Sequence, residues 1–241
     1  MNSTEIILHW LYVIVMFGSA IAFYMLSNNP KGVPQYKYLI HIFVVVWSGL
    51  AYSALALDQG YAIVNEQKVH YARYIDWVVS TPLLLLSLTL TGKYNLKVEG
   101  TLTGALLGSQ VIMILTGLVA ELSPENVQYY WYAAGCIALV VVLYIFWGPL
   151  LEKARLQNED IIRVYRYSAA YLTFQWIAYP VVWLIGQPGL GWLSPTVSVA
   201  LFIILPIISK AGFGFFNLFL LRNMENTESK VDIESFSFGA K

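Results

Sequence analysis

A lysine in the middle of an apolar stretch is the residue of this sequence with the clearest chemical potential. Lys210 lies within residues 198–221, which are otherwise almost wholly apolar and long enough to cross a bilayer. Two further charges, Arg73 and Asp76, lie three residues apart in another apolar stretch, so they share one helix face. Because ionisable groups inside a membrane usually face the bundle interior and pair, Lys210 and Asp76 are the expected pair.

The residues alone leave two interpretations of that pair open. A structural salt bridge would need no cofactor. A lysine amine also forms Schiff bases with carbonyl compounds, and a protonated Schiff base would keep the positive charge and use Asp76 as its counter-ion. Ser80 lies one turn beyond Asp76, and Ser87 lies eleven residues beyond it, close to three turns. We therefore expect these three side chains on one helix face.

The composition is that of a membrane protein. Of the 241 residues, 58% are hydrophobic and 12% are charged, whereas soluble domains carry about 25% charged residues. Lys and Arg equal Asp and Glu at 14 each, so no excess of positive charge points to nucleic acid. The one cysteine, Cys136, excludes an internal disulfide and is expected to be a small buried side chain. No metal site is expected.

Seven apolar stretches predict an all-α fold, a seven-transmembrane-helix bundle in the cell membrane. No Lys or Arg precedes the first stretch, which argues against a cleaved signal peptide. We expect a transmembrane domain over residues 1–222 and a polar, disordered tail over 223–241. The stretches run over residues 5–27, 36–57, 71–91, 99–122, 127–149, 162–186 and 194–221.

The loop charges predict the orientation of the bundle. Lys and Arg gather in the first, third and fifth loops, whereas the other three loops hold only Lys68. The positive-inside rule then puts the odd loops and the C-terminus in the cytoplasm and the N-terminus outside the cell.

Aromatic residues and prolines cluster on the spans that surround the buried charges. The segments "ARYIDWVVSTPLLLL", "WIAYPVVWLIG" and "SKAGFGF" are similar to the third-, sixth- and seventh-helix signatures of microbial rhodopsins. This resemblance, which covers nearly the whole chain, implies retinal bound as a Schiff base to Lys210. It also implies a narrow slot with rigid aromatic walls. The implied pocket residues are Trp77, Thr81, Met113, Gly117, Trp131, Tyr132, Trp176, Tyr179 and Pro180.

Three features depart from the outward proton pumps of that family. Such pumps typically carry a carboxylic acid at the position of Ser87, which reloads the Schiff base from the cytoplasm. Pro206, four residues before Lys210, stands where most of the family has an aspartate. The sixth loop, "IGQPGLGWLSPTVSV", has no acid, although outward pumps often keep glutamates there for proton release. The combination "LPIISK" resembles the xenorhodopsin branch, which includes the cyanobacterial sensory rhodopsin of Anabaena type.

In the cytoplasmic half, His41 is a candidate for proton transfer. It lies about one turn inside the cytoplasmic end of the second span, and histidine titrates near neutral pH. Inward pumps of the family can use a histidine here with an acid on the seventh helix, where this chain has Asn217. The alternative is a histidine at headgroup level that faces lipid or solvent. Proton release is expected to pass His41, Ser87 and Asn217.

Together these features predict a light-driven inward proton pump, which is not an enzyme. Lys210 would bear retinal, and Asp76 would be its counter-ion and primary proton acceptor. The alternative is a photosensor that signals through a soluble cytoplasmic transducer, and an outward pump is the least favoured of the three. Membrane lipid is the expected surrounding, and a homo-oligomer, with a trimer as one option, is the expected assembly. Nucleic acid is not an expected partner.

Overall fold

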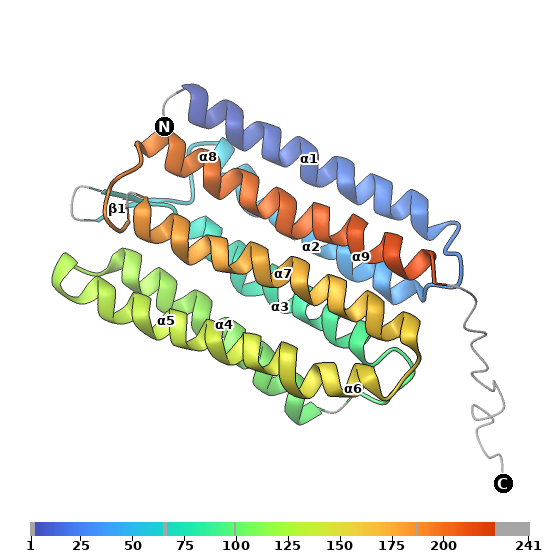
Figure 1. The fold of residues 1–241 in the computed structure, drawn as a ribbon. Helices are drawn as coiled ribbons and strands as arrows, with labels where there is room; N and C mark the ends of the chain where they lie inside the picture. The colour runs from blue at the N-terminus through green and yellow to red at the C-terminus, as the bar shows by residue number, and fades with distance from the viewer. Residues whose placement is uncertain (1–2, 65–66, 99, 187, 225–241) are drawn as a thin grey trace, which may run out of the picture.

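The computed structural model describes residues 3–64, 67–98, 100–186 and 188–224. Long helices lie side by side along one direction, and the N-terminus and a short hairpin lie at the same end of the bundle (Figure 1). Within the described residues, seven helical segments are long and apolar enough to cross a membrane. The predicted tail lies outside the described residues from position 225 onward.

The helix bounds agree with the predicted spans to within a few residues at most ends. The fifth span is the exception, because it continues past Pro149 to Arg155 through a π-helical turn. The last span also contains a π-helical turn, η2, which carries Lys210. The elements are α1 (Ser3–Ser27), α2 (Gln35–Ala56), α3 (Tyr71–Gly92), α4 (Gly100–Leu122), α5 (Glu125–Ile145), η1 (Phe146–Leu150), α6 (Leu151–Arg155), α7 (Glu159–Ile185), α8 (Pro195–Pro206), η2 (Ile207–Gly212) and α9 (Phe213–Arg222).

A two-stranded hairpin between α2 and α3 was not predicted from the sequence. Strand β1 (Ala62–Val64) pairs antiparallel with β2 (Gln67–Val69), with Ala62 opposite Val69. The backbone N–H of Ala72 donates to the carbonyl of Gly60 at 2.9 Å, which ties the first turn of α3 to this loop. Gly60 has a φ of +72°, a conformation that glycine adopts without steric cost. The hairpin therefore holds the beginning of α3, where Arg73 lies.

Helix α3 presents one polar face to the bundle interior. The side chains of Asp76, Ser80 and Ser87 are all fully buried, which confirms that they share a face. Ser80 donates to the backbone carbonyl of Asp76 at 2.8 Å, so its hydroxyl is satisfied within the helix. Since α3 packs against α2, Asp76 and Ser87 on this face meet side chains of α2.

Candidate functional site

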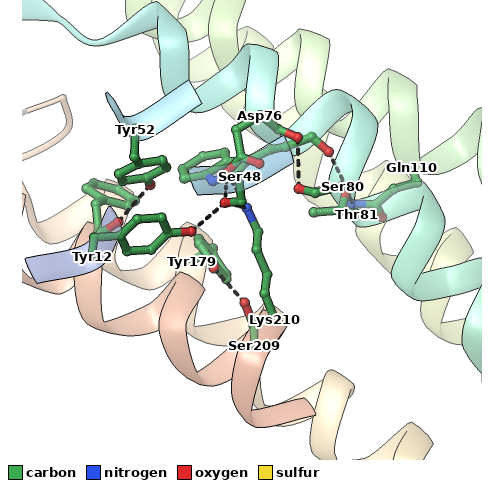
Figure 2. Close-up of polar contacts among 12 residues, drawn as sticks. Tyr12, Ser48, Tyr52, Asp76, Ser80, Thr81, Gln110, Tyr179, Ser209 and Lys210 are labelled. Carbon is green, nitrogen blue, oxygen red and sulfur yellow. Dashed lines mark hydrogen bonds and ion pairs between the residues drawn. The ribbon is translucent and has the colours of Figure 1, made fainter. Parts of the chain in front are cut away.

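Lys210 and Asp76 form an ion pair in the centre of the bundle. Lys210 Nζ contacts Asp76 Oδ2, and both side chains are shielded completely from solvent. Lys210 reaches α3 from the π-helical turn η2, as Figure 2 shows. The predicted pairing is thus confirmed. Because breaking a buried pair leaves an uncompensated charge, neither residue can be replaced alone without cost.

Ser48 of α2 is the third member of this centre, and the sequence analysis did not identify it. Its hydroxyl donates to Asp76 Oδ2 at 2.9 Å and accepts from Lys210 Nζ at 2.9 Å. A serine hydroxyl has one proton to give and two lone pairs. The contact between Ser48 Oγ and the Tyr12 hydroxyl, at 2.5 Å, must therefore have Tyr12 as donor. Ser48 holds the lysine and the carboxylate in one fixed arrangement (Figure 2).

A cavity with mostly aromatic and aliphatic walls lies among α3, α4, α5, α7 and α8, and its lining residues Trp77 and Tyr179 neighbour Asp76 and Ser209. The ring of Trp77 meets that of Tyr179 edge to face, with centroids 5.2 Å apart, and Tyr179 OH lies 2.9 Å from Ser209 Oγ. Eight of the nine predicted pocket residues line the cavity: Trp77, Thr81, Met113, Gly117, Tyr132, Trp176, Tyr179 and Pro180.

The ninth predicted pocket residue, Trp131, does not line the cavity. Neighbouring helix residues point about 100° apart, and on α5 it is Tyr132 that faces inward. Tyr132 donates to the carbonyl of Pro180 at 3.1 Å. The Trp131 ring instead packs edge to face on Tyr130, with centroids 5.4 Å apart. The resemblance alone did not distinguish these adjacent aromatic residues.

Several cavity residues were missed from the sequence. Gln110 lines the cavity and donates from Nε2 to Thr81 Oγ1 at 2.8 Å, and Thr81 donates to the carbonyl of Trp77 at 2.7 Å, so Gln110 fixes its neighbour in the cavity wall. Its spacing from Met113 and Gly117 places all three on one face of α4, a signal that the sequence contains. The other missed lining residues are Tyr74, Ile114, Gly135, Cys136, Leu139, Trp183 and Phe202.

Arg73 lies on the hairpin side of the ion pair. It is buried, its guanidinium carbon is 5.2 Å from the centre of the Phe202 ring, and it lines a second cavity of about 320 Å³. Glu5, His70 and Glu121 line the same cavity, and the carboxylate of Glu121 accepts a hydrogen bond from Tyr74. The cavity is large enough and polar enough for several water molecules.

His41 lies on the opposite side of the ion pair and is fully buried. The alternative of a histidine that faces lipid or solvent is therefore wrong. Its Nε2 lies 3.2 Å from Ser87 Oγ, and Ser87 Oγ lies 3.5 Å from Asn217 Oδ1. The three residues named for proton release thus contact one another. Asn217 also donates to Ser168 Oγ at 2.9 Å, a contact that the sequence analysis did not anticipate.

Comparison with known proteins identifies the family and the fold. Residues 3–224 match the family described as bacteriorhodopsin-like proteins. Sensory rhodopsin-2 of Natronomonas pharaonis is 29% identical over 211 residues, which cover 88% of this chain and 87% of the relative. Bacteriorhodopsin of Halobacterium salinarum is 31% identical over 215 residues, which cover 86% of this chain and 79% of the relative. The chain belongs to the bacteriorhodopsin-like family.

A solved rhodopsin structure is similar throughout the bundle. The light-driven proton pump rhodopsin of Coccomyxa subellipsoidea superimposes with a TM-score of 0.84 at 28% identity, covering 91% of this chain and 97% of that chain. Microbial rhodopsins carry retinal as a Schiff base on a lysine, and the lysine of this rhodopsin is Lys210.

The residues of this rhodopsin fit retinal on three counts. Lys210 supplies the amine, Asp76 supplies a carboxylate beside it, and the adjoining cavity supplies apolar walls drawn from α3, α4, α5, α7 and α8. Asp76 Oδ1 has no hydrogen-bond partner among the described residues, so one carboxylate oxygen is free to accept another N–H or O–H donor. An aldehyde with a long apolar chain suits these walls.

Proposed function

We propose that this rhodopsin is a light-driven inward proton pump of the xenorhodopsin branch. The positive-inside rule places the hairpin end outside and the His41 end in the cytoplasm. The observation that carries the proposal is the chemistry of the cytoplasmic half. His41, Ser87 and Asn217 contact one another there, and no carboxyl group among the described residues bonds to any of them. Such a path lacks the acid with which outward pumps reload the lysine nitrogen from inside.

Asp76 is the proposed counter-ion and primary proton acceptor on the outer side of Lys210. Bound retinal supplies a light-driven isomerisation, which turns the N–H of the Schiff base and changes its basicity. Ser48 keeps Asp76 and the lysine nitrogen in register during the dark state, since it bonds to both. Pro206 contributes no charge, so Asp76 is the carboxylate that balances Lys210. The Lys210 nitrogen releases its proton inward, and Asp76 then accepts a proton from the outside and passes it to that nitrogen.

The direction of the light-driven pH change tests the proposal. Cells that express the protein are supplied with retinal, suspended without buffer and illuminated. We expect the external medium to become alkaline, and we expect a protonophore to abolish the change. Acidification of the medium would contradict inward transport.

The colour of a variant tests the assignment of the counter-ion. Asp76→Asn removes the negative charge that stabilises the positive Schiff base in the dark state. We expect its absorption maximum to lie at longer wavelength than that of the unmodified protein. Ser80→Ala is the matched control, because Ser80 bonds to the backbone of its own helix. An unshifted spectrum in Asp76→Asn would place the counter-ion elsewhere.

A photosensor is the second candidate function. The specific observation in its favour is the match to Sensory rhodopsin-2 of Natronomonas pharaonis over 87% of that relative. A sensor would signal through a soluble cytoplasmic transducer, and light would cause no sustained pH change in cells. A complete photocycle in the purified protein together with an unchanged external pH would favour this candidate. A homo-oligomer, with a trimer as one option, is proposed for either function.

A further inference from the structure

A second lysine, Lys37, is buried in the bundle, although it is one of the Lys and Arg residues of the first loop that predict the orientation. Lys37 lies in the first turn of α2, at the end of the bundle opposite the hairpin, and its exposed fraction is 0%. Burying a lysine at this depth is costly, since the desolvation of one ion costs several kcal/mol. Its place near the proposed release path calls for a functional explanation.

The partners of Lys37 are neutral. Its Nζ donates to the backbone carbonyl of Ser87 at 3.1 Å and to Thr91 Oγ1 at 2.9 Å. In the part of the chain that the structure describes, no carboxylate is paired with it. The nearby ends of α3 and α9 carry two further basic residues, Lys93 and Arg222. Unlike Arg, a buried Lys can give up its proton and later take one back.

Hydrogen bonds connect Lys37 to the residues already proposed for proton release. Asn217 Nδ2 lies 3.4 Å from Thr91 Oγ1, which is the oxygen that accepts from Lys37. Asn217 Oδ1 in turn contacts Ser87 Oγ, which contacts His41. Lys37 and His41 are also four residues apart on α2, so they share a helix face. Lys37 lies nearer the beginning of α2 than His41 does, since it is in the first turn of that helix.

We infer that Lys37 is the last proton-binding group of the inward path, a role that rests on the proposed inward transport. The Lys37 side chain is an uncharged amine in the dark. After illumination an N–H bond at the Lys210 nitrogen breaks, and an N–H bond at Lys37 Nζ forms, by way of the His41 and Ser87 region. The resulting ammonium then loses its proton to the cytoplasm and returns to the amine. Lys37 thus takes the place of a carboxylic acid.

Two substitutions test whether Lys37 acts by binding and releasing a proton, rather than through a permanent charge or through packing alone. Lys37→Met keeps the approximate length and removes the nitrogen, whereas Lys37→Arg introduces a permanent charge that cannot be lost. We expect both to slow light-driven proton release to the cytoplasm by about a hundredfold, the low end of the effect of removing a proton-transfer group. Lys97→Met, which removes an exposed lysine in the third loop, is the control and should leave the rate unchanged. Release at the unmodified rate in Lys37→Arg or in Lys37→Met would overturn the inference.

A measurement on the retinal-free protein tests the resting state of Lys37 independently of transport. The protein is labelled with ¹⁵N at lysine Nζ, and its spectrum is recorded at neutral pH. The Lys37 signal is assigned by its loss in Lys37→Arg, so the assignment survives if Lys37→Met does not fold. We expect the shift of a neutral amine, and the shift of an ammonium would overturn the inference. If the cells show no alkalinisation, the inward pump fails, yet this spectrum still decides whether Lys37 is poised to accept a proton.

Discussion

The ion pair of Lys210 and Asp76 has no exposed surface, and Ser48 is hydrogen-bonded to both members. At the scale of single residues this arrangement explains why a lysine is tolerated in the middle of a membrane span. The positive charge is balanced by one carboxylate, and Ser48 adds a hydrogen bond to each partner. Hydrogen bonds to ionised groups are stronger than neutral ones, about 1.5–3 kcal/mol each. Both buried charges are therefore paired and hydrogen-bonded.

Removing the lysine alone should damage the retinal-free protein as well as the pigment. Lys210→Ala leaves the Asp76 carboxylate buried without its partner, which costs about 3–5 kcal/mol of unfolding free energy. Adding Asp76→Asn should recover most of that loss, because the stranded charge is gone. Denaturant titration of the retinal-free proteins measures both values. Equal stability of the single and the double variant would contradict the pairing.

Colour provides the matching test for the loaded protein. Lys210→Ala should show no visible absorbance after addition of retinal, since no amine remains to form the Schiff base. Ser209→Ala is the neighbouring control, because Ser209 bonds to Tyr179 and not to the ion pair, and it should stay coloured. A coloured Lys210→Ala variant would disprove the attachment site.

At the scale of helices, Pro206 explains the shape of the last span. Proline has no N–H, so the carbonyl of Phe202, four residues earlier, loses its usual helical donor. Tyr52 of α2 replaces that donor, since its hydroxyl lies 3.0 Å from the Phe202 oxygen. The π-helical turn follows directly after Pro206 and carries Lys210. Tyr52 therefore links α2 by a hydrogen bond to α8, the segment directly before the turn that carries Lys210.

The role of Tyr52 can be measured with a double-mutant cycle. Tyr52→Phe keeps the ring, which stacks on Tyr12 with centroids 3.9 Å apart, but leaves a buried carbonyl without a donor. We expect a loss of about 1–3 kcal/mol in unfolding free energy. In a Pro206→Ala background the restored N–H can satisfy Phe202, so the same substitution should cost less. Equal costs in both backgrounds would show that the two residues are not coupled.

At the scale of the whole molecule, the two ends of the bundle differ in chemistry. The hairpin end holds the cavity lined by Glu5, His70, Arg73 and Glu121, whereas the other end holds His41, Lys37 and their neutral partners. Carboxylates thus line the cavity on the hairpin side of the ion pair. On the other side, no carboxylate is hydrogen-bonded to His41 or Lys37 among the described residues. This asymmetry agrees with proton uptake at one face and release at the other.

The orientation of the bundle is tested by labelling cysteines in intact cells. The native Cys136 is first replaced by serine, and a cysteine is then placed at Ile63 in the hairpin or at Lys97 in the third loop. Both positions are exposed. A membrane-impermeant thiol reagent should label Ile63→Cys and leave Lys97→Cys unlabelled until the cells are opened. The reverse pattern would invert the topology and, with it, the direction of transport.

The sequence by itself determined the seven spans, the Lys210–Asp76 pair and eight of the residues that line the cavity. Those conclusions depend on local quantities: the length of an apolar run, the cost of a charge inside it, and helical spacing. The segments around Asp76, Trp176 and Lys210 indicated the microbial rhodopsin family as well. The same reasoning placed the serines of α3 on a common face, and the structure confirms it.

Only the tertiary structure decided which polar residues from different helices meet. Nothing in the sequence of α2 distinguishes Ser48, Tyr52 and Lys37 from their neighbours. The structure shows that they bond to residues of α3 and α8, namely Asp76, Phe202 and Ser87. The choice of Tyr132 over Trp131 as a cavity residue likewise depends on the rotation of α5. Helix rotation and packing arise from contacts between residues far apart in the sequence, so hydropathy and spacing along one segment do not specify them.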